Sequence, residues 1–400
     1  MTNSAAVLFR VFGSDTSAQD VATESLDPAV WPVTVTSAVL HQCAPMFRER
    51  LRERHLLHEL PQNVQAQLTQ LTRETAARNL CGTHQLQELT ARLSGRSPLI
   101  ALKGACLART CYRDVSLRPM LDLDVLAKES DLAAVREALR SLGYEQSPRA
   151  QPTAHAHHEP PYVKRGLLHI ELHRSLLGQP DPFSIDPEGL WARAVPAAGT
   201  PGLFYLCQED QLLHVCLHAG YHHQLNIGLY AFIDIAASVR SPDLNWQRVV
   251  GRARQWKAER CLFLMLEMAR TLVGAEVPRE ILNELRPADF ADDIVRMALS
   301  AVYNKRANGY EPNVFLSQII THLVMEGGWR SIPGQIRRRL LRSPEMRTRW
   351  PNSAHAPTWY GQLAPLVSGL LGLAARRPDR EHLLGRLNGA RARRWMVPTG

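Results

Sequence analysis

Residues 99–126 read LIALKGACLARTCYRDVSLRPMLDLDVL, and the predicted fold is built around this segment. It begins with a short apolar run over 99–102, which is typical of a buried strand, and passes through Lys103-Gly104 into a helix expected over 105–112. Acidic and aliphatic residues then alternate from 120 to 126, and this alternation indicates a second strand. Strand, glycine turn, helix and strand in this order predict a small α/β unit.

The flanking sequence extends this unit and then changes character. A helix is expected over 132–142, where Ser130-Asp131 precedes it and Gly143 follows it, and a third strand is expected over 167–172. Apolar residues recur at helical spacing on both sides of this core. We therefore predict an α+β fold with four parts: a helical N-terminal region at 1–95, a catalytic core at 96–202, a helical domain at 203–329 and a basic tail with short helices at 330–400.

Composition places the chain among ordinary folded proteins. Of its 400 residues, 45% are hydrophobic and 21% are charged, which excludes a disordered chain. The first residues lack the pattern of a secretory signal, and the longest apolar run, 363–375, is too short to span a bilayer and contains Pro365. The seven cysteines never form a CxxC pair, so we expect reduced thiols and a cytoplasmic location.

The net charge of +9 is unevenly distributed. Residues 330–400 hold 14 arginines and three acidic residues, so this tail alone carries +11. A basic tail favours an anionic partner such as nucleic acid or an acidic protein surface. The whole chain has 42 arginines and five lysines, however, so a compositional bias toward arginine is an alternative explanation.

Three carboxylates point to metal chemistry. Asp122 and Asp124 lie two residues apart in a predicted strand, which puts both side chains on the same face. Acids this close repel each other unless a cation lies between them, and Glu171 in the third predicted strand adds a third carboxylate. Oxygen ligands suit Mg²⁺ or Mn²⁺. Without metal, neutralising any one of the three acids is expected to relieve repulsion and stabilise the fold; the structural alternative is pairing with a basic residue such as Arg118.

Taken in order, these motifs resemble the polymerase-beta-like nucleotidyltransferase superfamily, in which a glycine turn precedes an hDh[DE]h strand and a third acid lies on a later strand. More narrowly, the chain resembles the bacterial uncharacterised nucleotidyltransferase family. The resemblance spans about residues 97–280, and its closest segments are 102–144, HIELH at 169–173, LLHVCLHAG at 212–220, LYAFIDIAASV at 229–239 and LNWQRVVGRARQW at 244–256.

The resemblance implies a palm-like mixed sheet and the transfer of a nucleoside monophosphate from a nucleoside triphosphate to an acceptor, with release of pyrophosphate. Asp122, Asp124 and Glu171 would be the catalytic metal ligands for Mg²⁺ or Mn²⁺. The implied nucleotide-binding residues are Lys103, Gly104, Ala105, Arg118 and His158, and the implied site-lining residues are His173, His218 and Asp234.

Two of these residues, Ala105 and Arg118, need a separate account. Ala105 stands where the superfamily usually has serine, so backbone amides near Gly104 and the Lys103 ammonium would contact phosphate instead. Arg118 either neutralises phosphate charge or forms a salt bridge with Asp114 or Asp122. The acceptor and the base of the nucleotide stay open.

Sixteen histidines allow a different reading of the site. His214, His218 and His222 are spaced for one face of a helix, although Gly220 is expected to end that helix before His222. His214 and His218 with Asp234 would then be a zinc hydrolase site, with hydrogen-bonded core histidines as the structural alternative. A further alternative is a catalytically idle nucleotidyltransferase-like module that binds RNA or a protein through its basic tail.

Overall fold

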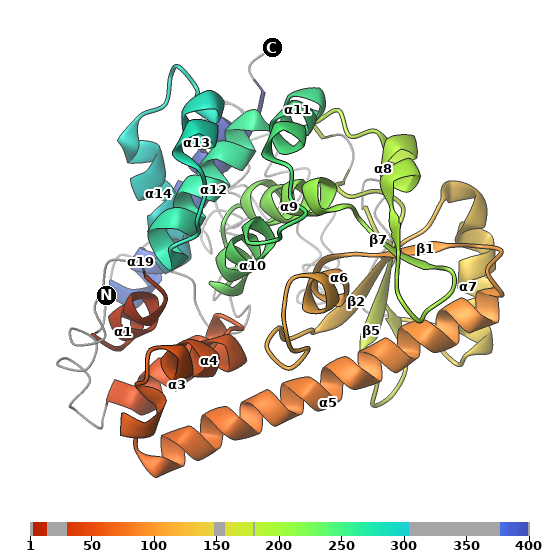
Figure 1. Ribbon diagram of the computed structural model, residues 1–400, viewed down its shortest axis with the longest axis horizontal. Helices are drawn as coiled ribbons and strands as arrows, with labels where there is room; N and C mark the ends of the chain where they lie inside the picture. Colours follow the sequence, from red (N-terminus) through yellow and green to blue (C-terminus); the bar gives the residue numbers. More distant parts are fainter. Residues whose placement is uncertain (1–2, 14–29, 148–156, 179–180, 304–376, 399–400) are drawn as a thin grey trace, which may run out of the picture. The chain divides into compact units, whose positions relative to one another are not determined.

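A computed structural model describes residues 3–13, 30–147, 157–178, 181–303 and 377–398. The chain divides into two compact units, of which the first comprises residues 1–223, 227–289 and 397–400, and the second residues 224–226 and 290–396. The first unit contains a mixed sheet surrounded by helices (Figure 1). The predicted α+β class is therefore confirmed.

The sheet has seven strands in the order β3-β4-β5-β2-β1-β7-β6. Strand β2 runs parallel to β5 and antiparallel to β1, and β1 runs parallel to β7, so the sheet is mixed. Its strands are β1 (Leu99–Ala101), β2 (Asp122–Leu126), β3 (Glu145–Gln146), β4 (Tyr162–Val163), β5 (His169–His173), β6 (Val195–Pro196) and β7 (Leu203–Tyr205). The three strands expected from the sequence, β1, β2 and β5, lie at its centre.

Two helices cover one face of this sheet. Helix α5 (Gln62–Leu93) contributes its C-terminal leucines, and α7 (Leu132–Ser141) packs beside it. Their apolar side chains meet those of Leu123 and Val125 from β2 in a single buried cluster. Because strand residues alternate between faces, burying these two side chains turns Asp122 and Asp124 to the opposite face.

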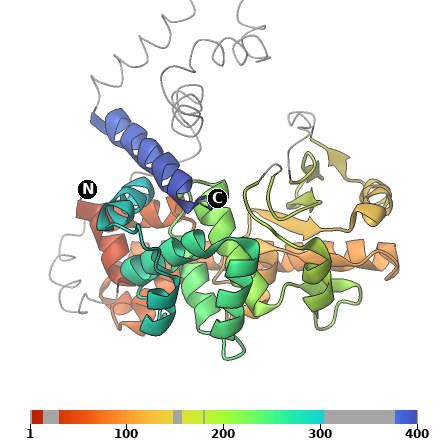
Figure 2. The ribbon, with the colours of Figure 1, turned by 90° about the horizontal axis from the view of Figure 1, so that it is seen from above.

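The N-terminal helices pack together beside the start of α5 (Figures 1 and 2). They are α1 (Asn3–Phe12), α3 (Val30–Leu40) and α4 (Ala44–Glu53), and a short 3-10 turn, η1 (Leu57–Glu59), precedes α5. The first of these helices, α1, is firmly packed. Its residues Val7, Leu8 and Val11 are buried, because helical spacing gathers them on one face.

A second group of helices faces the acidic side of the sheet. Helix α12 (Glu259–Val273) forms the centre of this group, and ten of its 15 side chains are buried. The others are α8 (Pro187–Arg193), α9 (Gln208–Cys216), η3 (Leu217–His222), α10 (Tyr230–Val239), α11 (Trp246–Trp256) and α13 (Arg279–Leu285). Helices α9 and α10 pack against α12.

In the second unit, α14 (Asp292–Tyr303) packs along α19 (Arg377–Met396). The basic tail expected over 330–400 falls mostly outside the described residues, and only its last helix, α19, is described. No helix in the described ranges is both long enough and apolar enough to cross a membrane.

Candidate active site

The register of two parallel strands brings the acidic residues together. Asp124 of β2 lies opposite Glu171 of β5, and Asp122 lies opposite His169. Since side chains alternate, Glu171 and His173 share the face that Asp122 and Asp124 occupy. The repeated acid at 122 and 124 and the sequence HIELH therefore place five polar side chains on one face of the sheet, of which His169 is exposed.

Lys103 is held over this patch by the turn between β1 and α6 (Lys103–Thr110). Its backbone has a φ of 46°, a left-handed conformation that is strained for a residue with a side chain. Its Nζ lies 2.7 Å from Oδ1 of Asp124, and both side chains are largely buried. The turn thus supplies a cation directly to the acidic cluster.

His173 contacts the same oxygen of Asp124. Its Nε2 lies 2.7 Å from Asp124 Oδ1 and 3.8 Å from Glu171 Oε2, and the ring is completely buried. Burial by itself would raise the pKa of Asp124, but the Lys103 ammonium and His173 outweigh it and hold that pKa well below its usual range. Asp124 is therefore ionised whenever the protein is folded at neutral pH.

Asp122 has the opposite electrostatic setting. Burial, followed by the negative charges of Asp124 and Glu171, raises the pKa of Asp122 to about 7. Lys103 and Arg118 partly offset this rise. Like charges in a poorly solvated site favour the protonated form of one member. In the absence of a cation, Asp122 is thus the member of the acidic cluster whose ionisation is most unfavourable.

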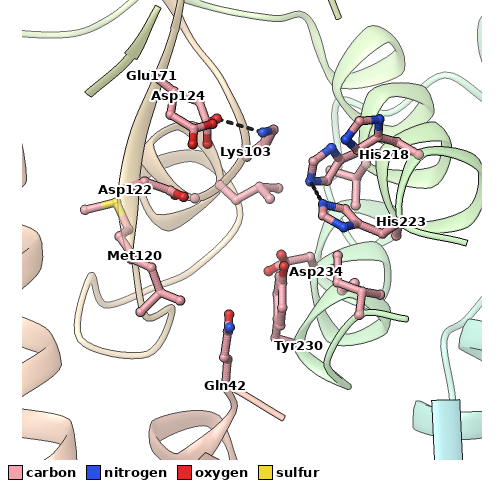
Figure 3. A pocket seen from close by; sticks show the side chains of 18 of the residues that line it. Gln42, Lys103, Met120, Asp122, Asp124, Glu171, His218, His223, Tyr230 and Asp234 are labelled. Atoms are coloured by element: carbon pink, nitrogen blue, oxygen red, sulfur yellow. Dashed lines mark hydrogen bonds and ion pairs between the residues drawn. The ribbon is translucent and has the colours of Figure 1, made fainter. Parts of the chain in front are cut away.

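A cavity of about 300 Å³ separates the acids from the helices of the first unit. In Figure 3, Asp122, Asp124 and Glu171 extend from the sheet on one side, and His218 and His223 face them from the helices on the other. The lining also includes Gln42, Lys103, Gly104, Arg118, His158, His222, Tyr230 and Asp234.

A π-helix carries His218 and His222, which line the cavity opposite the acids. Helix α9 does not end at Gly220, as we expected, but continues as η3 through His222. The wider π turn brings His222 over His218, with ring centroids 5.5 Å apart and an interplanar angle of 13°. Interruptions of this kind are common at functional sites. The prediction failed because glycine weakens a helix by only about 1 kcal/mol, which tertiary packing can offset.

Arg118 and Asp234 form a buried ion pair in the cavity wall. Arg118 Nε lies 2.9 Å from both carboxylate oxygens of Asp234, and Nη2 lies 2.8 Å from one of them. The Tyr112 hydroxyl donates to Asp234 at 2.6 Å, and the guanidinium lies over the Tyr230 ring. The partners expected for Arg118, Asp114 or Asp122, are thus wrong: its salt-bridge partner comes from α10.

The other sequence-predicted residues divide between the cavity and the core. Gly104 lines the cavity, and a Cβ at this position would lie 3.2 Å from Met120 Cγ, so a larger residue would crowd the wall. His158 also lines it, with Nε2 3.8 Å from Glu171 Oε2. Ala105 is instead buried in the apolar cluster, so its side chain does not face the cavity.

The ligand set of a zinc hydrolase is not assembled. Both carboxylate oxygens of Asp234 are used by Arg118, so Asp234 is not available to complete a site with His214 and His218. Among the described residues, the one group of three side chains with ligand atoms mutually within 4.8 Å is Asp124, Glu171 and His173. Two carboxylates and an imidazole are a donor set that binds divalent cations, so these residues fit a metal.

The mixed sheet carries two acids on one strand and a third on its parallel neighbour, beside a glycine turn, which is the arrangement that the sequence resemblance implied. The chain belongs to a family described as uncharacterised nucleotidyltransferase, whose model matches residues 27–274. The matched segment includes α3, α4 and α5, which the sequence resemblance did not cover. No curated protein and no solved structure matches the chain.

Proposed function

We propose that the protein transfers a nucleoside monophosphate from a nucleoside triphosphate to an acceptor hydroxyl and releases pyrophosphate. The observation that carries this proposal is the convergence of Asp122, Asp124 and Glu171 in one cavity beside Lys103. Membership of a nucleotidyltransferase family supports the reaction class. That the donor is a nucleoside triphosphate, that the acceptor is a hydroxyl and that the ion is divalent all belong to the proposal.

The start of α6 is the proposed contact for the phosphates. Backbone amides at a helix N-terminus have no partner within the helix and attract anions. Gly104 lines the cavity next to these amides, and the Lys103 ammonium lies on the same side of the cavity as the acids. Arg118 adds a second basic group to the wall, although Asp234 already balances its charge.

Asp122, Asp124 and Glu171 would hold Mg²⁺ or Mn²⁺, which would neutralise charge on the triphosphate oxygens. Glu171 is the proposed acceptor for the proton of the attacking hydroxyl. As that oxygen forms its bond to the α-phosphorus, the bond from the α-phosphorus to pyrophosphate breaks. His158, 3.8 Å from Glu171, is suited to orient the Glu171 carboxylate.

Nucleotide binding is expected to depend on a divalent cation. The three acids repel a triphosphate until its charge is compensated, so we expect at least about a tenfold tighter dissociation constant with Mg²⁺ or Mn²⁺ than with EDTA. Calorimetric titration of each triphosphate under both conditions measures this difference. Equal affinities would contradict a metal-bridged complex, and Asp124→Asn should show a much smaller difference than the unchanged protein.

A catalytically idle binding module is the second candidate, and one observation favours it. Asp124 already has two cationic or donor partners, Lys103 and His173, so the cluster is partly compensated without metal. Incubating the protein with each labelled triphosphate, divalent cation and cell extract separates the two candidates. Transfer of label to an acceptor supports the enzyme, whereas binding of RNA or protein without transfer supports the module.

A further inference from the structure

The strands offer a nitrogen ligand beside the acids. His173 follows Glu171 by two residues on β5, so both side chains lie on the face that carries Asp124. The Nε2 atom of His173 is 2.7 Å from an oxygen of Asp124 and 3.8 Å from one of Glu171. Three potential ligand atoms from two adjacent strands therefore converge on one point.

The imidazole is not locked in a state that would prevent ligation. The hydrogen bond that one ring nitrogen of a histidine makes decides whether the other nitrogen is protonated or free to bind a metal. Nδ1 of His173 is buried and has no hydrogen-bond partner among the described residues. No donor therefore occupies Nδ1, the proton can reside there, and the lone pair of Nε2 is available to a cation.

Anchoring Asp124 does not account for His173. Lys103 already places an ammonium 2.7 Å from Asp124 Oδ1, which compensates the charge of that carboxylate. His173 reaches the same oxygen, so it is a second donor where one is sufficient. A fully buried imidazole between two carboxylates can instead serve as a metal ligand, once a cation displaces the contacts that Lys103 and His173 make with Asp124.

We propose that His173, Asp124 and Glu171 form a mixed nitrogen and oxygen site that selects a first-row transition ion such as Mn²⁺ or Co²⁺ over Mg²⁺. The physical reason is that Mg²⁺ prefers oxygen ligands alone, whereas transition ions gain from an imidazole nitrogen. This inference deepens the proposed function, on which it rests for the use of the metal. It adds a nitrogen ligand to the carboxylates named in the proposed function.

The test measures metal binding by the full-length chain without nucleotide. Calorimetry with Mn²⁺ and Mg²⁺ is applied to the unchanged protein, to His173→Gln and to His169→Gln, a matched control on the same strand and face whose side chain is exposed. We expect His173→Gln to weaken Mn²⁺ binding at least about tenfold and Mg²⁺ binding less than about threefold. His169→Gln should change neither.

Pulsed electron paramagnetic resonance of bound Mn²⁺ provides a measurement that needs no variant. Coupling of Mn²⁺ to a ¹⁴N nucleus is expected in the unchanged protein and in His169→Gln. Bound Mn²⁺ without nitrogen coupling overturns the proposal, as does an equal loss of both ions in His173→Gln. Nitrogen coupling in a protein that transfers no nucleotide supports this site and argues against the proposed function, so the two failures are distinguishable.

Discussion

Replacing Asp124 by asparagine is expected to reduce nucleotidyl transfer by about a thousandfold or more, because lost charge stabilisation of several kcal/mol in the transition state has that effect. Asp122→Asn and Glu171→Gln should have effects of similar size, since each removes a carboxylate from the same cavity wall. The measurement is the rate of label transfer from a nucleoside triphosphate in Mg²⁺ or Mn²⁺. Rates within about tenfold of the unchanged protein at all three positions would contradict the proposed reaction.

The same substitutions should affect stability in opposite directions. Asp122→Asn should raise the thermal midpoint in EDTA, because it removes the acid that burial and its acidic neighbours disfavour. Asp124→Asn should lower it, because Lys103 would then be left largely buried without its counter-ion. For Asp122 this agrees with the expectation from sequence alone, that every such change stabilises, and for Asp124 it differs from it. Asp243→Asn, at an exposed position, is the control and should change little.

The effect of Asp122→Asn should also depend on pH. Because the pKa of Asp122 is raised to about 7, the folded protein retains this proton where the unfolded chain has lost it. Ionisation therefore costs stability increasingly as pH rises from about 4 to about 7, by at most about 4 kcal/mol. The gain from Asp122→Asn should be small near pH 4 and largest above pH 7. Thermal unfolding in EDTA across this range measures it, and a gain that is constant with pH would contradict the assigned ionisation.

Breaking the Arg118–Asp234 pair should destabilise the protein by about 3–5 kcal/mol, since it leaves an uncompensated charge in a buried wall. Arg118 is 6% exposed and Asp234 is 1% exposed, so water cannot replace the lost partner. Asp234→Leu leaves the guanidinium unpaired, and Arg118→Met leaves the carboxylate with only the Tyr112 hydroxyl. Urea unfolding measures the loss for each variant.

Two further variants test whether the loss comes from the charge of the Arg118–Asp234 pair. The double variant Arg118→Met with Asp234→Leu should recover much of the loss, because no charge is then stranded. Arg140→Met should cost less than about 1 kcal/mol, because its ion pair with Glu137 is exposed to solvent. A double variant as unstable as either single variant would show that packing against Tyr230, rather than charge, accounts for the loss.

Much of the acidic site could be predicted from local sequence. Alternation within a strand is a property of the backbone, so the spacing of Asp122 and Asp124 already put both on one face, away from the buried Leu123. Glu171 was predicted from the same kind of pattern. The short strands β6 and β7, of two and three residues, were missed because so few residues show no periodicity. Strand β7 joins the sheet through pairing with β1 and β6.

The partners of these residues were decided by tertiary structure. Arg118 pairs with Asp234, 116 residues away, because packing of α10 near the sheet brings the two together, and no local pattern encodes such a contact. The capture of Asp124 by both Lys103 and His173 likewise depends on three separate segments. Backbone periodicity thus let the sequence by itself determine which residues share a strand face. Whether a charge on that face is compensated depends on side chains distant in the chain, which only the folded structure brings within reach.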